Sequence, residues 1–138
     1  MRIGFICTGN SARSQMAEGY AKHFAKLYGK DVEVYSAGSS PAKEVHPLAI
    51  RVMQEEGIDI SSQHPKPIEA IPYDKLDIVI TLCGDAKETC PYVPSARMDH
   101  WGLPDPAKAE GSEEERLKFF RKVRDKIKAR VEELIRSL

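Results

Sequence analysis

The chain has 138 residues, 41% of them hydrophobic, so it can bury one substantial core and is expected to form a single domain over residues 1–138. Its 21 basic and 21 acidic residues cancel to a formal net charge of zero, which argues against nucleic acid or an anionic membrane as a partner and is compatible with a monomer. No apolar run approaches the length of a membrane span, and no apolar signal segment opens the chain.

The first predicted strand contains Ile3, Phe5 and Ile6, a short apolar run typical of a strand buried on both faces. A helix is predicted from Ser14, where apolar residues begin to recur at helical spacing, to a C-terminal cap near Gly29. The remaining predicted elements are a strand at 32–35 stopped by the run 36–41, a helix at 47–56, a loop at 61–72 with one turn around 68–70, a strand at 77–82, a short strand at 96–98, a loop at 99–112 and a helix at 113–138.

This alternation predicts an α/β fold: one three-layer domain, with a four-stranded parallel sheet and helices on both faces. Ligands of such sheets bind at the carboxyl ends of the strands. Cys7, Ser36 and Cys83 are each expected at such an end, and therefore on one rim of the sheet.

The segment that follows Cys7 is a candidate oxyanion loop, and it contains Thr8, Gly9, Asn10, Ser11, Ala12 and Arg13. A loop between a strand and a helix N-terminus directs unpaired N–H groups and the helix dipole at one point. Gly9 and Asn10 tolerate the left-handed backbone that lets such groups converge. The Arg13 guanidinium suits two oxygens of a tetrahedral oxyanion, and these features, with a hydrogen bond from Ser14, favour ionisation of Cys7 to a nucleophilic thiolate. The alternative is a buried cysteine beside a solvated arginine.

Cys83 and Cys90 form a second feature, seven residues apart. Three cysteines without the pattern of a small secreted domain favour a reducing cytoplasm and thiol chemistry. The spacing of Cys83 and Cys90 is a poor match to a metal site. A buried core thiol is a further alternative. If the residues between them are helical, they lie about 10 Å apart along the axis. A disulfide needs Cα atoms within about 7 Å, so its formation would require this segment to unwind.

The oxyanion loop resembles that of the low-molecular-weight protein tyrosine phosphatases and of the thioredoxin-coupled arsenate reductases that share their fold. The three cysteines narrow the resemblance to the reductases, because the phosphatases lack the second and third. The matching segments cover nearly the whole chain: Cys7–Ser11, Arg13–Glu18, Tyr35–Gly38, Thr81–Cys83, Cys90–Pro91 and His100–Pro106.

The resemblance implies a thiol relay that reduces arsenate to arsenite. In that scheme Cys7 attacks arsenate, Cys83 attacks Cys7 as arsenite leaves, and Cys90 attacks Cys83. Thioredoxin then reduces the Cys83–Cys90 disulfide. Phosphate and sulfate would compete as oxyanions, and weak phosphatase activity is expected.

Asp105 matches the general acid of the family, which protonates the departing oxygen. The alternative is a turn residue, because Asp next to Pro is common in turns. The phosphatases follow this Asp-Pro pair with a tyrosine that stacks on an aromatic substrate. Here Ala107 follows, which favours a small inorganic oxyanion.

Several relatives bind potassium near the loop, through residues that match Asn10, Glu18 and Ser36 and through an aspartate. Lys66 stands in place of that aspartate, where its ammonium group could pair with Glu18. We therefore expect that the protein needs no metal or other cofactor, potassium included.

Two other functions remain open at this point. The first is a low-molecular-weight phosphatase, which would use Cys7, Arg13 and Asp105 through a phosphocysteine. The second is a non-enzymatic, redox-switched oxyanion-binding module. A requirement for Cys83 and Cys90 in arsenate turnover would distinguish the reductase from both of these functions.

Overall fold

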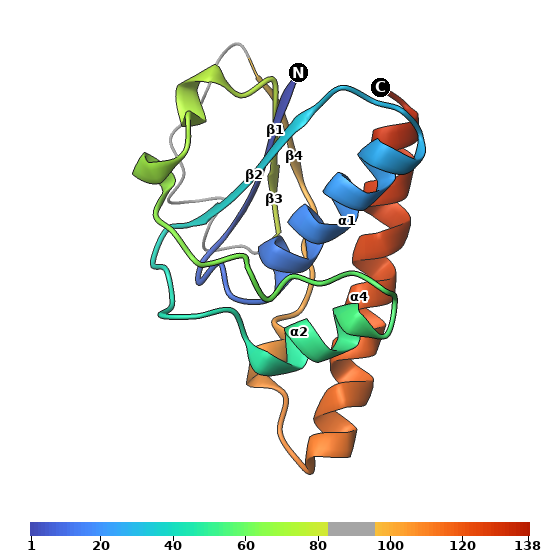
Figure 1. Ribbon diagram of the computed structural model, residues 1–138. Helices are drawn as coiled ribbons and strands as arrows, with labels where there is room; N and C mark the ends of the chain where they lie inside the picture. Colours follow the sequence, from blue (N-terminus) through green and yellow to red (C-terminus); the bar gives the residue numbers. More distant parts are fainter. Residues whose placement is uncertain (83–95) are drawn as a thin grey trace.

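The structure is a computed structural model that describes residues 1–82 and 96–138 (Figure 1). Cys83 and Cys90 lie outside the described residues. Four parallel strands form one sheet in the order β2-β1-β3-β4. They are β1 (Arg2–Cys7), β2 (Glu33–Gly38), β3 (Ile78–Thr81) and β4 (Arg97–His100).

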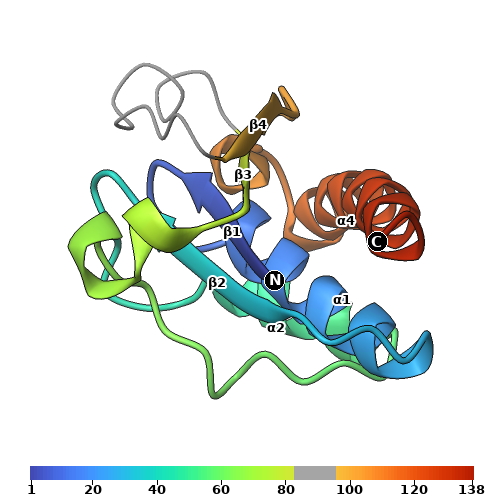
Figure 2. The same ribbon diagram turned by 90° about the horizontal axis from the view of Figure 1, so that it is seen from above.

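Three α-helices pack together on one face of the sheet, with α1 in contact with both of the others. They are α1 (Arg13–Leu27), α2 (Pro47–Gln54) and α4 (Glu113–Arg136). Two short 3-10 helices, Ile68–Ala70 and Tyr73–Lys75, lie on the other side (Figure 2). The predicted α/β class with its four-stranded parallel sheet is thus confirmed. No helix among the described residues combines the length and apolar character that a membrane crossing requires.

The core lies between the sheet and the helices that cover it, with side chains from β1, α1 and α4 among its members. Ile3, Phe5 and Ile6 of β1 are fully buried, as expected of a central parallel strand covered on both faces. On α4, the buried stripe includes Phe120 and Ile127, which recur at the spacing of one helix face. The helix begins where predicted, since the Ser112 hydroxyl accepts the backbone N–H of Glu115 at 3.2 Å.

The second strand differs from the prediction. It does not stop at Ser36 but continues to Gly38, in register with Phe5–Cys7 of β1. Its last three residues are buried and small because the loop after β1 crosses them: a Cβ atom at Gly38 would lie 2.6 Å from the Thr8 carbonyl oxygen. The small residues therefore mark a close approach of two chain segments. The fourth strand also runs past 98, to His100.

Candidate active site

Cys7 ends β1 and is buried, with two hydrogen bonds converging on its sulfur. The backbone N–H of Asn10 donates to Sγ at 3.2 Å, and Ser14 Oγ lies 2.8 Å away. Ser14 Oγ also accepts a hydrogen bond from Asn10 Nδ2 at 2.7 Å, which leaves its own proton available for the sulfur. A thiolate would accept from both groups, so this arrangement favours a thiolate over a thiol.

Asn10 is the residue that shapes the loop. Its φ of 50° is in the left-handed region, where asparagine is tolerated. Its side-chain oxygen accepts the backbone N–H of Lys66 at 3.0 Å, and its carbonyl accepts Gln15 Nε2 at 2.9 Å. The expectation for Gly9 was wrong, because Gly9 has no positive φ. A single left-handed residue turns the chain here.

The N-terminus of α1 faces this loop without a side-chain cap. Ala12 occupies the N-cap position and has no side chain that could accept a hydrogen bond, and the first turn contains no acidic residue. The N–H groups and the dipole of a helix N-terminus favour an anion. The structure thus combines an uncapped helix start with a buried cysteine.

Arg13 and Asp105 lie together, although they are distant in sequence. Arg13 Nη1 donates to the Leu103 carbonyl at 3.0 Å, and Nη2 lies 3.5 Å from Asp105 Oδ2. Asp105 Oδ1 accepts the Ala107 N–H at 3.0 Å, at the start of a 3-10 helix, Pro106–Lys108. The Asp105 side chain is 26% exposed and that of Arg13 only 9%, so the carboxylate is closer to solvent.

Glu18, Ser36 and Lys66 form a polar cluster behind the loop. Glu18 is buried and accepts a hydrogen bond from the Ser36 hydroxyl. Lys66 Nζ lies 4.0 Å from Glu18 Oε1, while Lys22 Nζ, which the sequence analysis did not include, is closer at 2.6 Å from Oε2. Burial lowers the pKa of Lys66, against the opposing effect of Glu18.

The roles of two glutamines were also missed: Gln15 bonds to the loop, and Gln63 bonds to Gln15. Gln63 Nε2 donates to the side-chain oxygen of Gln15 at 2.8 Å and to its carbonyl at 3.1 Å. Gln15 in turn holds the Asn10 carbonyl. Because Gln15 lies one residue after Ser14 on the predicted helix, its position beside the loop was a usable signal. Gln63 lies in a segment without periodicity and gave none.

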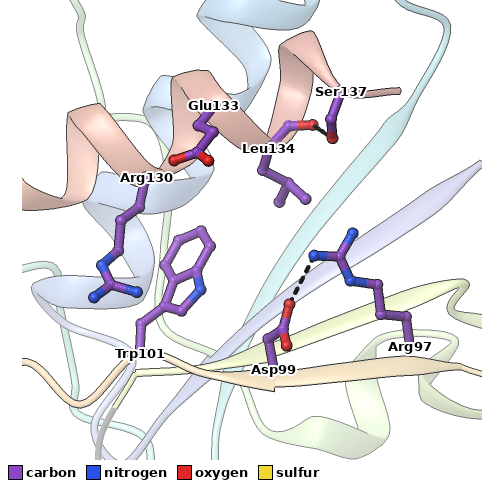
Figure 3. A pocket seen from close by; sticks show the side chains of 7 residues that line it. All are labelled: Arg97, Asp99, Trp101, Arg130, Glu133, Leu134 and Ser137. Carbon is purple, nitrogen blue, oxygen red and sulfur yellow. Dashed lines mark hydrogen bonds and ion pairs between the residues drawn. The ribbon is translucent and has the colours of Figure 1, made fainter.

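A separate surface cavity of about 340 Å³ lies between β4 and the C-terminal half of α4 (Figure 3). The Arg130 guanidinium lies 5.8 Å from the ring centre of Trp101 at one side, and Arg97 pairs with Asp99 at 2.9 Å on the other. Neither Cys7 nor Arg13 lines it. Within residues 1–82 and 96–138 no group of three metal-binding side chains converges.

A cysteine at the carboxyl end of a parallel strand, under an uncapped helix N-terminus and beside an arginine–carboxylate pair, defines the α/β proteins built around a cysteine-containing oxyanion loop. Residues 2–138 match the sequence profile of the low molecular weight phosphotyrosine protein phosphatases, and the chain belongs to that family.

Relatives within the family are similar along nearly the whole chain. An arsenate reductase from Bacillus licheniformis is 52% identical over 130 residues, which cover 94% of this chain and 91% of the relative. A solved arsenate reductase in the phosphate-binding state is 39% identical, with a TM-score of 0.80 over 99% of this chain and 97% of its own. A thioredoxin-dependent arsenate reductase from Corynebacterium glutamicum is 34% identical, with a TM-score of 0.76 over 99% of this chain and 60% of its own.

Proposed function

We propose that this protein reduces arsenate to arsenite, with Cys7 as the nucleophile and thioredoxin as the final reductant. The observation that carries the proposal is the pair of hydrogen bonds that Asn10 and Ser14 direct at the Cys7 sulfur. A thiolate held in this way, under the N-terminus of α1, is suited to attack a tetrahedral oxyanion. The arsenate reductases among its relatives support arsenate as that oxyanion.

In the first step, Cys7 attacks arsenic and an As–O bond breaks. Arg13 binds two oxygens of the oxyanion, and Asp105 supplies the proton that the departing hydroxide needs. Their separation of 3.5 Å allows both to reach one ligand over the loop. The product is a covalent bond between the Cys7 sulfur and As(V).

In the later steps, electrons come from thiols. Cys83 attacks the Cys7 sulfur, the S–As electron pair passes to arsenic, and arsenite leaves as As(III). Cys90 then attacks Cys83 and releases Cys7, and thioredoxin reduces the Cys83–Cys90 disulfide. The reducing cytoplasm is the compartment in which such a relay works. The thioredoxin-dependent relative supports this reductant.

Lys66 takes the place of a potassium ion in this proposal. Its ammonium group lies beside Glu18 and donates to the His64 carbonyl at 2.9 Å, so a fixed positive charge stands next to the buried carboxylate. Turnover should then be the same in potassium and sodium salts at equal ionic strength.

The first experiment is arsenate-dependent NADPH oxidation with thioredoxin and thioredoxin reductase. We expect sustained turnover by the wild type and none by Cys90→Ser or Cys83→Ser, while both variants still hydrolyse an aryl phosphate slowly. Ser137→Ala, at the far end of α4, controls for substitution itself.

The family also favours a second candidate, a phosphatase that forms a phosphocysteine on Cys7. It predicts strong aryl phosphate hydrolysis that does not depend on Cys90, with no arsenate turnover. A redox-switched binding module would bind the oxyanion and show neither activity.

A further inference from the structure

His46 connects the oxyanion loop to two helices. Its backbone N–H donates to the Ser11 carbonyl at 2.8 Å, in the middle of the loop. Its side chain caps α2, because Nδ1 accepts the Leu48 N–H at 3.1 Å. Its ring packs against Phe120 of α4, with the ring centres 4.8 Å apart. One half-buried residue thus contacts the loop, α2 and α4.

The cap requires a neutral imidazole. Since Nδ1 accepts a hydrogen bond, the ring proton must be on Nε2. Protonation of Nδ1 would turn it into a donor that faces the Leu48 N–H, and the cap would be lost. Loss of the cap would release the chain at the point where it holds Ser11.

The surroundings of His46 favour the neutral form. Burial and the charge of Arg116, on the first turn of α4, lower the pKa of His46, and the opposing effect of Asp105 is smaller.

We propose that His46 is a positioning residue, whose neutral ring fixes the oxyanion loop and whose protonation loosens it. This inference deepens the proposed function, because it concerns the loop that would bind the oxyanion. It predicts that oxyanion binding weakens as the pH falls and the His46 ring becomes protonated.

Sulfate is the probe, because it stays a dianion between about pH 5 and pH 8. His46→Asn keeps a capping acceptor but cannot titrate, and His46→Ala removes the cap. We expect wild type and His46→Asn to bind sulfate equally at pH 8, and wild type to bind at least about threefold more weakly at pH 5. At pH 8, His46→Ala should bind sulfate about three- to fivefold more weakly than the wild type, as expected for the loss of one cap, and at pH 5 it should bind about as weakly as the wild type does. His64→Asn, at the exposed histidine that also precedes a proline, should follow the wild type.

A wild-type to His46→Asn affinity ratio that does not change with pH would overturn the inference. Nuclear magnetic resonance of the wild type provides a test that needs no variant to fold. The amide signals of both Ser11 and Leu48 should titrate with the His46 ring, and a Ser11 signal that stays still would also refute the link. Failure of sulfate to bind at any pH, with these signals still titrating together, would count against the proposed oxyanion site and support the role of His46 in positioning the loop.

Discussion

Replacement of Ser14 by alanine should impair the ionisation of Cys7 without removing the nucleophile. Ser14 is fully buried, and its hydroxyl lies 2.8 Å from the Cys7 sulfur and 2.7 Å from Asn10 Nδ2. A hydrogen bond to a charged group contributes about 1.5–3 kcal/mol, which corresponds to an about 10- to 100-fold smaller thiolate equilibrium constant. Asn10 Nδ2 also loses its acceptor, which costs about 1–3 kcal/mol of folding stability.

The assay is the rate of alkylation of Cys7 by iodoacetamide as a function of pH, in a background where Cys83 and Cys90 are serine. Ser14→Ala should react about tenfold or more slowly near pH 6 and reach the wild-type rate in strong base. Ser14→Thr, which keeps the hydroxyl, should recover most of the loss. Overlapping pH profiles for Ser14→Ala and wild type would refute the argument.

Three further predictions concern the fold and the polar cluster. Two arginines of α4 hold the pKa of Glu55 at about 2, below its unfolded value of 4.5, so the stability from this pair is present above pH 4.5 and is lost as the pH falls toward 2. Because the Glu55 side chain is 34% exposed, we expect the pair to contribute about 1 kcal/mol to the free energy of unfolding. Urea unfolding of Glu55→Gln, measured as a function of pH, should lack this part of the acid dependence. Gly38→Ala should destabilise the fold by about 1–3 kcal/mol and slow Cys7 alkylation, since its Cβ would meet the Thr8 carbonyl oxygen. In Gly9→Ala the new Cβ makes only an ordinary contact at 3.5 Å, so thermal unfolding should show a smaller loss of stability. Lys66→Asp should give a melting temperature that differs between potassium and sodium salts at equal ionic strength. Equal melting curves in the two salts would refute the proposal that Lys66 takes the place of a potassium ion.

The local features of the loop were predictable from sequence, because they lie on consecutive residues. Cys7, Asn10 and Ser14 are joined across one strand end and one helical turn, so strand and helix patterns were enough to bring them together. The roles assigned to them remain proposals. The 3-10 turn at 68–70 was also predicted correctly, from the prolines that surround it.

The features that were missed depend on packing between distant segments. The end of β2 was misplaced because Ser36–Gly38 has the composition of a turn, and only the crossing of the loop above explains its small residues. The contacts of His46 with Ser11 and Phe120 likewise join segments that are far apart in the sequence. Lys22 is the exception, because it follows Glu18 by four residues on the same helix, a spacing at which opposite charges pair, and its partner could have been read from the sequence.

The hydrogen bond from Arg13 to the Leu103 carbonyl joins residues 90 positions apart, and the bond from Lys66 to Asn10 spans 56. Contacts with such long sequence separations form late and slowly during folding. The loop that follows Cys7 is therefore held at Asn10 and at Arg13 only after the segments of Lys66 and Leu103 have docked, and the surroundings of Cys7 are incomplete until then. The reactivity of Cys7 should thus report the completion of the tertiary structure, which makes it a built-in kinetic probe of folding.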